Sequence, residues 1–326
     1  MSGERPLISI IVPVYNEAEN VRACYDRVVI VTTQLAAQYD FEFLFTDNHS
    51  SDATFEILRS LSEADERVRC IRFSRNFGYQ NSIFTGYLNA RGDAAIQLDA
   101  DLQDPPELIP SFLEHWQDGN EVVYGIRRSR QENFIVRKLR GLFYWMVDVL
   151  SDDYLPRDAG DFRLVSRRIL DELNKIRDQN LYLRGLIAGL GFRQTGIPYD
   201  RDPRQHGQSK FSFFSLIGFS LNAFVGHSIL PLRLASVIGL ITAALMIFGI
   251  VGYLVARIYF GSEWPPGFVT LTILQLLAIT LNALFLGIIG EYIGRVYTEV
   301  RDRPVTVVET TLNVEADAVR VSGRSS

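Results

Sequence analysis

Up to about residue 230 the chain alternates short apolar runs with longer stretches in which apolar residues recur at helical spacing. Five runs predict buried strands: Leu7–Val14, Phe41–Thr46, Val68–Phe73, Ala94–Leu98 and Glu121–Gly125. A helical stretch follows each of the first four, as in Ala18–Gln38 and Ala53–Ala64. This alternation predicts an α/β, Rossmann-like fold in which helices cover both faces of a mostly parallel sheet.

Polar residues follow the predicted strands at the points where the strands end. Asn16-Glu17 comes after the first strand, Asp47-Asn48 after the second, and Asp99-Ala100-Asp101 after the fourth. Ligands of parallel α/β sheets bind beyond the carboxyl ends of the strands. We therefore expect these three segments to line one ligand site.

Beyond residue 230 two long runs contain no Asp, Glu, Lys or Arg: Leu234–Ala256 and Gly267–Gly290. At about 1.5 Å rise per residue each would span about 35 Å as a helix, more than a hydrocarbon core of about 30 Å. We predict a two-helix transmembrane hairpin in residues 231–293, with spans at about 232–256 and 267–290. The alternative is a pair of buried core helices.

Basic residues flank this hairpin, with Arg233 before it and Arg301 and Arg303 after it. By the positive-inside rule both termini and the first domain, residues 1–210, face the cytoplasm of a multi-pass inner-membrane protein. Glycines in both runs favour close packing, so a homo-oligomer through these helices is a candidate assembly.

Two further segments complete the expected organisation. Residues 211–230 are apolar but interrupted by Ser, Gly, Asn and His, which favours an amphipathic helix at the membrane interface. Residues 134–150 combine a group of basic residues with a group of aromatic residues, which fits either a core helix or a lipid-docking surface. Residues 294–326 form a cytoplasmic tail that we expect to be loosely ordered from Pro304 onward.

The composition and charge of the chain limit the partners and the kinds of site that we expect. The net charge of −5 gives no global basic character, which argues against nucleic acid as a partner. The two cysteines, Cys24 and Cys70, have no spacing typical of a zinc site or disulfide framework. No apolar signal core precedes the first predicted strand, so we do not expect export of the N-terminal domain by that route.

Asp99 and Asp101 are the clearest candidates for chemistry. Two carboxylates one residue apart at a strand end are hard oxygen ligands suited to Mg²⁺ or Mn²⁺. Such an ion can bridge a diphosphate and neutralise the charge that develops when the diphosphate leaves. Acidic turns are common in proteins. The position of this acid pair directly after the fourth predicted strand is what favours a metal site.

A succession of motifs carries a family resemblance. VPVYNE, TDNHSSD, SRNFGYQNS, LDADLQDPPE and DAGDFRLVSRR occur in this order across residues 8–215. The succession resembles inverting family 2 glycosyltransferases with the GT-A fold, and within them the polyprenyl-phosphate branch. That branch includes bactoprenol glucosyltransferases and dolichyl-phosphate mannose synthases.

The resemblance implies roles for the matching residues. For the nucleotide sugar it implies Pro13, Tyr15, Glu17, Asp47, Asp99, Arg201, Ser209 and Lys210. For the metal it implies Asp99, Asp101 and Gln103, and for the acceptor phosphate Arg127 and Arg137. The chain departs from the family's DDGS segment at Asn48 and His49, which leaves the base selectivity open.

The segment Asp158–Arg163 is where the resemblance places a catalytic carboxylate, and both Asp158 and Asp161 fit. A phosphate monoester has a second pKa near about 6, so the acceptor is largely ionised at neutral pH without a strong base. We expect the aspartate to orient the acceptor or Arg163, which we count among the catalytic residues. The alternative is a structural ion pair from Asp161 to Arg163 or Arg167.

Together these features predict a membrane-anchored, metal-dependent hexosyltransferase. Its donor would be a nucleotide diphosphate sugar, with UDP-glucose favoured over GDP-mannose, and its acceptor polyprenyl (undecaprenyl) phosphate. Transfer with inversion would give a lipid-linked monosaccharide for cell-envelope glycan modification. A polysaccharide synthase of the same fold normally has more spans and a QxxRW segment, and no Trp here follows an Arg. A non-catalytic membrane scaffold is the other alternative, and the complete set of predicted metal ligands argues against it.

Overall fold

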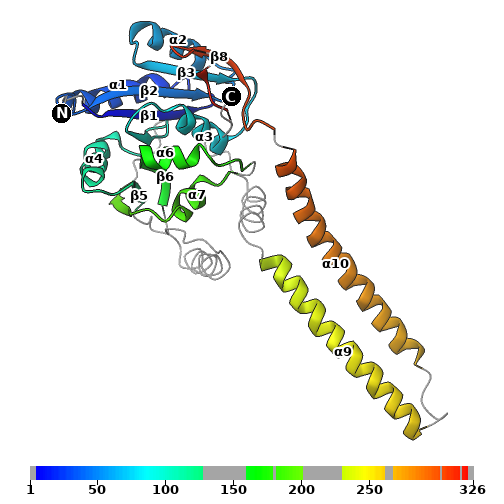
Figure 1. Ribbon diagram of the computed structural model, residues 1–326. Helices are drawn as coiled ribbons and strands as arrows, with labels where there is room; N and C mark the ends of the chain where they lie inside the picture. The colour runs from blue at the N-terminus through cyan, green and yellow to red at the C-terminus, as the bar shows by residue number, and fades with distance from the viewer. Residues whose placement is uncertain are drawn as a thin grey trace. The chain divides into compact units, whose positions relative to one another are not determined.

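The computed structural model describes two compact units, each considered by itself. The first unit holds the described residues up to 200 together with those from 303 onward, and the second holds two long helices (Figure 1). The described residues are 5–127, 159–178, 181–200, 230–260, 267–301, 303–315 and 318–321.

An eight-stranded sheet of order β7-β5-β6-β4-β1-β2-β3-β8 forms the centre of the first unit. Its strands are β1 (Leu7–Val14), β2 (Asp40–Asp47), β3 (Val68–Phe73), β4 (Ala94–Gln97), β5 (Val122–Arg127), β6 (Ala159–Ser166), β7 (Gln194–Tyr199) and β8 (Val308–Leu312). The five predicted strands are all present, with ends within one or two residues of those expected. β1 pairs in parallel with β2 and β4, and β2 with β3, so the three predicted polar segments follow neighbouring strands.

The sheet is mostly parallel, as predicted, because six of its eight strands run in one direction and only β6 and β8 run the opposite way. β6 lies between β4 and β5 and is antiparallel to both, and β8 is antiparallel to β3. β7 pairs in parallel with β5. The sequence did not reveal these three strands because Asp161 and Arg163 interrupt β6, and because β7 and β8 contain few consecutive apolar residues.

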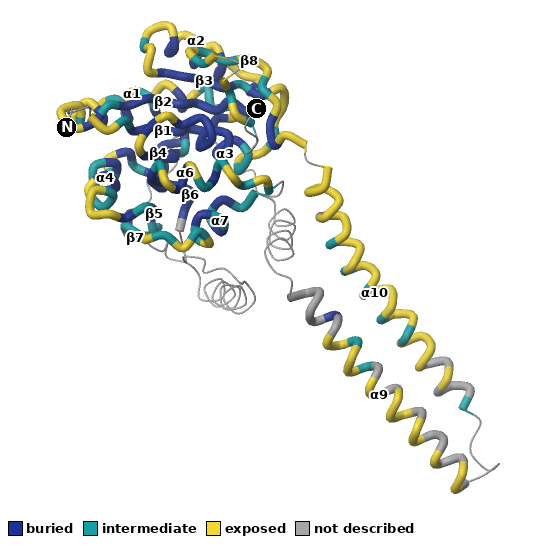
Figure 2. The backbone as a smooth tube through the Cα atoms, in the orientation of Figure 1, coloured by how far each residue is buried: buried dark blue, intermediate teal, exposed yellow. Residues whose placement is uncertain are grey.

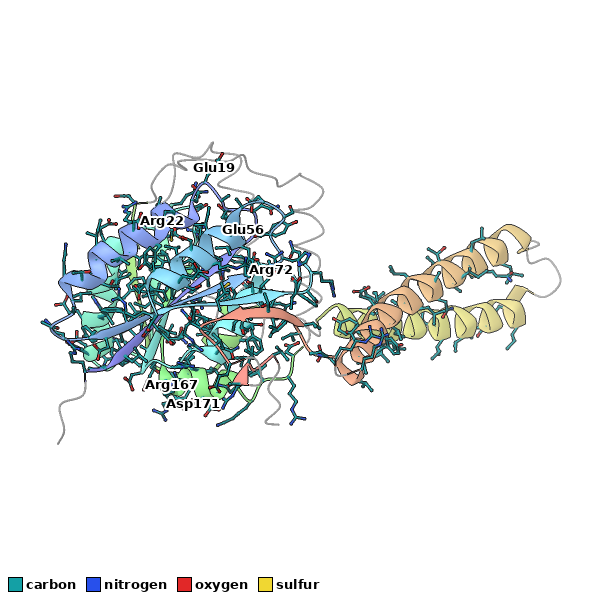
Figure 3. All side chains as sticks on the ribbon, turned by 90° about the horizontal axis from the view of Figure 1, so that it is seen from above. Glu19, Arg22, Glu56, Arg72, Arg167 and Asp171 are labelled. Carbon is teal, nitrogen blue, oxygen red and sulfur yellow. The ribbon has the colours of Figure 1, made fainter. Side chains whose placement is uncertain are left out.

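Helices cover both faces of the sheet. α1 (Val21–Gln34), α2 (Thr54–Ala64) and α4 (Ile109–Gln117) share one hydrophobic cluster, whereas α3 (Tyr79–Asn89), α6 (Arg167–Leu173) and α7 (Leu183–Gly189) share another. Ile10 of β1 belongs to the first cluster and its neighbour Ile11 to the second, because successive strand residues point to opposite faces. Figure 2 shows this buried centre, and Figure 3 shows Arg22 and Glu56 on one side of the sheet, with Arg167 and Asp171 on the other.

α3 packs unusually close to β1. A Cβ atom at Gly86 would lie 2.4 Å from Cγ2 of Ile11, so only glycine permits this approach. The close packing fixes the first residue of α3, Tyr79, beside the end of β4, where the tyrosine contacts Asp99.

The segment after α10 is ordered in its described part, so the expectation of a loose tail is wrong. Besides β8, its buried Thr306 shares a 2.9 Å hydrogen bond with Thr85 of α3. The Asn313 amide donates to two main-chain carbonyl oxygens, those of Ser62 and Val68. Main-chain pairing and these side-chain hydrogen bonds therefore attach the tail to the first unit. The polar composition of the tail gave no indication of this attachment.

The second unit contains α9 (Leu230–Phe260) and α10 (Phe268–Val300), each longer than the span expected from its uncharged run. Leu274–Val300 has the length and composition of a membrane-spanning helix, and 0% of its most apolar stretch is buried within the structure. In α9 the described residues give a shorter apolar stretch, Val237–Gly249. The helices are confirmed, and the alternative of buried core helices is wrong for the described part of α10. Insertion in a membrane stays a prediction.

Candidate active site

An acidic cluster lies where β4 ends. Asp99 and Asp101 follow the strand directly, and Leu102 has a left-handed φ of 55°, a conformation that L-residues rarely adopt. This turn lets the main-chain N–H of Gln103 donate to Asp101 Oδ1 at 3.2 Å. Asp101 and Gln103, two of the three predicted metal ligands, are both buried at this turn.

Asp99 is held by two donors. Tyr79 Oη donates to Asp99 Oδ1 at 2.5 Å, and Gln97 Nε2 donates to the same oxygen at 2.9 Å. Burial, followed by the charges of Asp104, Asp161 and Asp101, raises the pKa of Asp99 to about 7. The cluster therefore carries more negative charge than the surrounding protein compensates.

Asp104 is a further carboxylate of this acidic cluster. It is fully buried, and it accepts hydrogen bonds from Tyr199 Oη at 2.5 Å and from Arg127 Nη2 at 3.2 Å. Arg127 also donates to Tyr199 Oη through Nε. The predicted acceptor-phosphate residue Arg127 thus lies at the acidic cluster with its guanidinium partly engaged, and contact with an acceptor stays a prediction. Neither Asp104 nor Tyr199 was identified as a site residue from the sequence.

Asp161 on β6 forms a two-point ion pair with Arg184 on α7, with distances of 2.8 and 2.6 Å. Burial alone would raise its pKa, but the hydrogen bonds and charge of Arg184 hold the pKa of Asp161 below its ordinary value. Arg163 donates instead to the carbonyl of Gly160 at 2.9 Å, and Arg167 to the carbonyls of Ala90 and Gly92. Asp161 therefore does form an ion pair, as the structural alternative expected, but its partner is Arg184 rather than Arg163 or Arg167. No motif marks Arg184, which lies 23 positions along the chain.

Arg184→Met should destabilise the first unit by about 2 kcal/mol, because it leaves the carboxylate of Asp161 without its main partner. This loss of stability is smaller than that expected for a fully buried ion pair, because the Arg184 side chain is 34% exposed. Chemical unfolding of the purified chain measures the change, with the exposed Arg177→Met as the matched control. The double variant Asp161→Asn/Arg184→Met should regain part of the loss. Equal stability of Arg184→Met and wild type would contradict the prediction.

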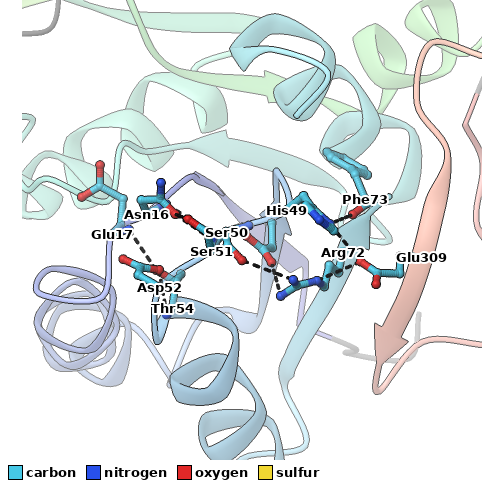
Figure 4. A network of polar contacts seen from close by, with 11 residues as sticks. Asn16, Glu17, His49, Ser50, Ser51, Asp52, Thr54, Arg72, Phe73 and Glu309 are labelled. Atoms are coloured by element: carbon cyan, nitrogen blue, oxygen red, sulfur yellow. Dashed lines mark hydrogen bonds and ion pairs between the residues drawn. The ribbon is translucent and has the colours of Figure 1, made fainter. Parts of the chain in front are cut away.

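Hydrogen bonds join the loops after β1 and β2 (Figure 4). Asn16, whose φ is 55°, donates through its main-chain N–H to Ser50 Oγ at 3.0 Å and accepts from the N–H of Ser51 at 2.8 Å. The N–H of Glu17 donates to Thr54 Oγ1 at 2.9 Å. The predicted nucleotide residues Pro13, Tyr15 and Glu17 therefore lie at one fixed edge, where Tyr15 is 44% exposed.

Asp47 is fully buried at the end of β2. Its Oδ1 accepts from the N–H and hydroxyl of Ser50, and its Oδ2 accepts from Arg72 Nη1 at 3.1 Å. Burial raises the pKa of Asp47, and these partners offset only part of that effect. Arg72 also donates to the carbonyl of Ser50 and lies 4.4 Å over the ring of Phe55. The structure thus brings Asp47 to the predicted edge but gives its oxygens partners within the protein.

Asn48 and His49, the two departures from the family segment, have definite roles here. The Asn48 side chain accepts from the N–H of Phe77 and donates to the carbonyl of Gly78, so it fixes the loop before α3. His49 has a φ of 63°, in the region that glycine occupies most readily, which fits a position where the family has glycine. Its Nδ1 lies 3.0 Å from Glu309 Oε2 of β8.

The remaining predicted site residues lie outside the described residues. These are Arg137, Asp158, Arg201, Ser209 and Lys210. The same holds for the expected helix in 134–150 and, up to residue 229, for the interfacial helix in 211–230.

The donor set at the end of β4 suits a hard divalent cation. In the described part of the chain no three His, Cys, Asp or Glu side chains already converge on one point. Mg²⁺ does not require such a cage, because it is commonly held by one or two carboxylates and completes its shell with water and phosphate oxygens. Burial and, after it, the neighbouring carboxylates raise the pKa of Asp99, and a cation at this point would neutralise the charges of those carboxylates. Asp99, Asp101 and Gln103 therefore fit such an ion.

Residues 9–174 match the family model described as glycosyl transferase family 2. The chain belongs to that family, as the motifs implied, and the sheet is the mixed α/β sheet of a GT-A-like domain.

Relatives similar over nearly the whole chain include members of the polyprenyl-phosphate branch. The glycosyltransferase YkcC of Bacillus subtilis is 40% identical over 94% of both chains. The SfII prophage-derived bactoprenol glucosyl transferase of Shigella flexneri is 33% identical over 93% of this chain and 97% of its own. A solved mannosyltransferase from Pyrobaculum calidifontis, in complex with GDP-Man and Mn²⁺, aligns with 87% of this chain at 16% identity and a TM-score of 0.49, too weak a likeness to carry an argument.

Proposed function

We propose that the protein transfers a hexose from a nucleoside diphosphate sugar, UDP-glucose being the favoured donor, to polyprenyl phosphate with inversion. The observation that carries this proposal is the acidic cluster at the carboxyl end of β4, where burial and three neighbouring carboxylates raise the pKa of Asp99 to about 7. Such a site favours a cation and, with it, a diphosphate. The bactoprenol glucosyl transferases among the relatives support a lipid phosphate as the acceptor.

In this reaction an acceptor phosphate oxygen forms a bond to C1 of the sugar, while the bond from C1 to the diphosphate oxygen breaks. Attack from the face opposite the leaving group inverts C1. A divalent metal held by Asp99, Asp101 and Gln103 would neutralise charge on the departing nucleoside diphosphate. Pro13, Tyr15, Glu17 and Asp47 lie in or beside the neighbouring loops, where they would meet the nucleoside. Arg127, at the acidic cluster, would attract the anionic acceptor.

The long helices support a lipid acceptor. In α10, Leu274–Val300 could cross a bilayer by length and composition, and its apolar residues are exposed. We propose that α9 and α10 form the transmembrane hairpin, that residues 1–210 are the cytoplasmic catalytic domain, and that 294–326 lie on the cytoplasmic side as well. In this arrangement the catalytic domain and the phosphate of a polyprenyl phosphate acceptor would lie on the same side of the membrane.

The decisive experiment offers the full purified chain, in detergent, a panel of labelled nucleotide sugars with undecaprenyl phosphate and Mg²⁺ or Mn²⁺. Label should move into the organic phase with one donor and remain in water when EDTA is added. A second reaction without the lipid provides the control. A folded chain that transfers no label from any donor would contradict the proposal and favour a non-catalytic scaffold.

Asp161→Asn should lower the transfer rate by about 10- to 100-fold without changing the shape of the pH–rate profile. The ion pair with Arg184 holds the pKa of Asp161 low, which makes the carboxylate a weak base better suited to orientation. Rates measured between pH 5.5 and 9 test this prediction. The loss of a basic-limb dependence in Asp161→Asn would show that the carboxylate accepts a proton.

A further inference from the structure

Glu309 brings the segment after α10 into contact with the loop that follows β2. Its Oε2 accepts from Arg72 Nε at 3.0 Å and lies 3.0 Å from His49 Nδ1 (Figure 4). His49 Nδ1 also lies 3.1 Å from the carbonyl oxygen of Phe73. Both neighbours of this nitrogen are acceptors, so Nδ1 carries the proton and donates.

The contact continues to the buried aspartate of the proposed nucleotide site. Arg72 donates through Nε to Glu309, through Nη1 to Asp47 and through Nη2 to the carbonyl of Ser50. One guanidinium therefore joins a carboxylate of β8 to a carboxylate of β2. Displacement of Arg72 would remove the donor to Asp47 Oδ2 and to the carbonyl of Ser50, two groups of the loop after β2, while Asp47 Oδ1 would still accept from Ser50.

A β-bulge aims the Glu309 side chain at this network. In the pairing of β3 with β8, Arg72 is opposite Thr310 and Phe73 is opposite Val308, so Glu309 is the additional residue on β8. Bulges insert one residue, re-aim its side chain and occur often beside active sites. The strand does not depend on Glu309 for attachment, because main-chain pairing, Thr306 and Asn313 already hold the segment.

We propose that Glu309 is a positioning residue for the nucleoside end of the donor site, where it orients His49 and Arg72 and, through Arg72, holds Asp47. This inference rests on the proposed function for the location of the nucleoside. It assigns a part in donor recognition to the segment that follows α10. It also accounts for His49, which lies where the family has glycine and gives Glu309 a second donor.

Binding of UDP, GDP, ADP and CDP to the full chain in detergent with Mn²⁺, measured by calorimetry, tests the proposal. Glu309→Gln should weaken binding of the preferred nucleotide by about three- to tenfold, a modest effect because the carboxylate is 45% exposed. The melting temperature without nucleotide should stay within about 2 °C of wild type, since the strand keeps its other anchors. Glu315→Gln is the matched control, because it removes an exposed carboxylate from the same segment.

A double-mutant cycle separates positioning from a general structural effect. If Glu309 acts through Arg72, Glu309→Gln should change the dissociation constant by less than about 1.5-fold in an Arg72→Gln background. The inference is overturned by unchanged binding in Glu309→Gln, by equal effects in both backgrounds, or by a wild type that binds none of the four nucleotides. Nucleotide binding without sugar transfer would contradict the proposed function and leave this inference standing.

Discussion

Asp101→Asn should lower the rate of sugar transfer by about 1000-fold or more, because it removes a carboxylate from the proposed metal site. An amide is a weaker ligand for a hard divalent cation than a carboxylate, and the cation would stabilise the leaving diphosphate. Asp101 is buried, and its Oδ1 accepts from the main-chain N–H of Gln103 in the turn at Leu102.

Initial rates of label transfer over a range of Mg²⁺ or Mn²⁺ concentrations measure this effect. Asp118→Asn, which removes an exposed carboxylate after α4, should retain the wild-type rate. The melting temperature of Asp101→Asn should remain close to that of wild type. A rate within tenfold of wild type at saturating metal would show that Asp101 is not a metal ligand.

Asp99→Asn should abolish transfer and yet stabilise the metal-free protein at pH 8. The pKa of Asp99 is raised from 3.8 to about 7, so between these values the folded chain binds more protons than the unfolded chain. The free energy of unfolding therefore falls as pH rises from about 4 to about 7 and stays low above that range. The full difference corresponds to about 4 kcal/mol, and we expect about 2 to 4 kcal/mol because Asp99 is partly exposed.

Asparagine has no such proton equilibrium but can still accept from Tyr79 and Gln97, so Asp99→Asn should gain that stability at pH 8 and little at pH 4. Unfolding of the full chain in detergent with EDTA, at both pH values, measures the difference. Mn²⁺ should raise the melting temperature of wild type more than that of Asp99→Asn. An identical pH dependence in both proteins would contradict the prediction.

The sequence was sufficient to predict the strands in which apolar residues predominate. β1 and β3 have the predicted ends because β-branched and other apolar residues dominate both strands, and nearly all residues of the two strands are buried. The acid pair after β4 was predicted for the same reason, since it directly follows such a run. Edge and antiparallel strands carry a weaker signal, and β8 (VETTL) has the composition of a loop.

The missed side chains are those whose partners lie far away in sequence. Glu309 is 260 positions from His49, and Tyr199 is 95 positions from Asp104. Tyr79, the first residue of α3, contacts Asp99, which is 20 positions away, and Gly86 lets the same helix pack closely on β1. Such pairs depend on strand order and helix packing, which hydrophobic periodicity does not encode, and Arg184 shows that a single arginine outside any motif can be the main partner of a predicted catalytic residue.

The position of β8 also constrains when the protein can finish folding during its synthesis. Arg72 and Glu309 are 237 positions apart, so at roughly 5–20 residues per second the edge of β3 waits on the order of ten seconds or more for its partner strand. Both long helices leave the ribosome in that interval. The loop after β2 therefore acquires its last partner only after α9 and α10 have been made. The order of synthesis would thus keep the donor site incomplete in a nascent chain that has not yet produced these two helices.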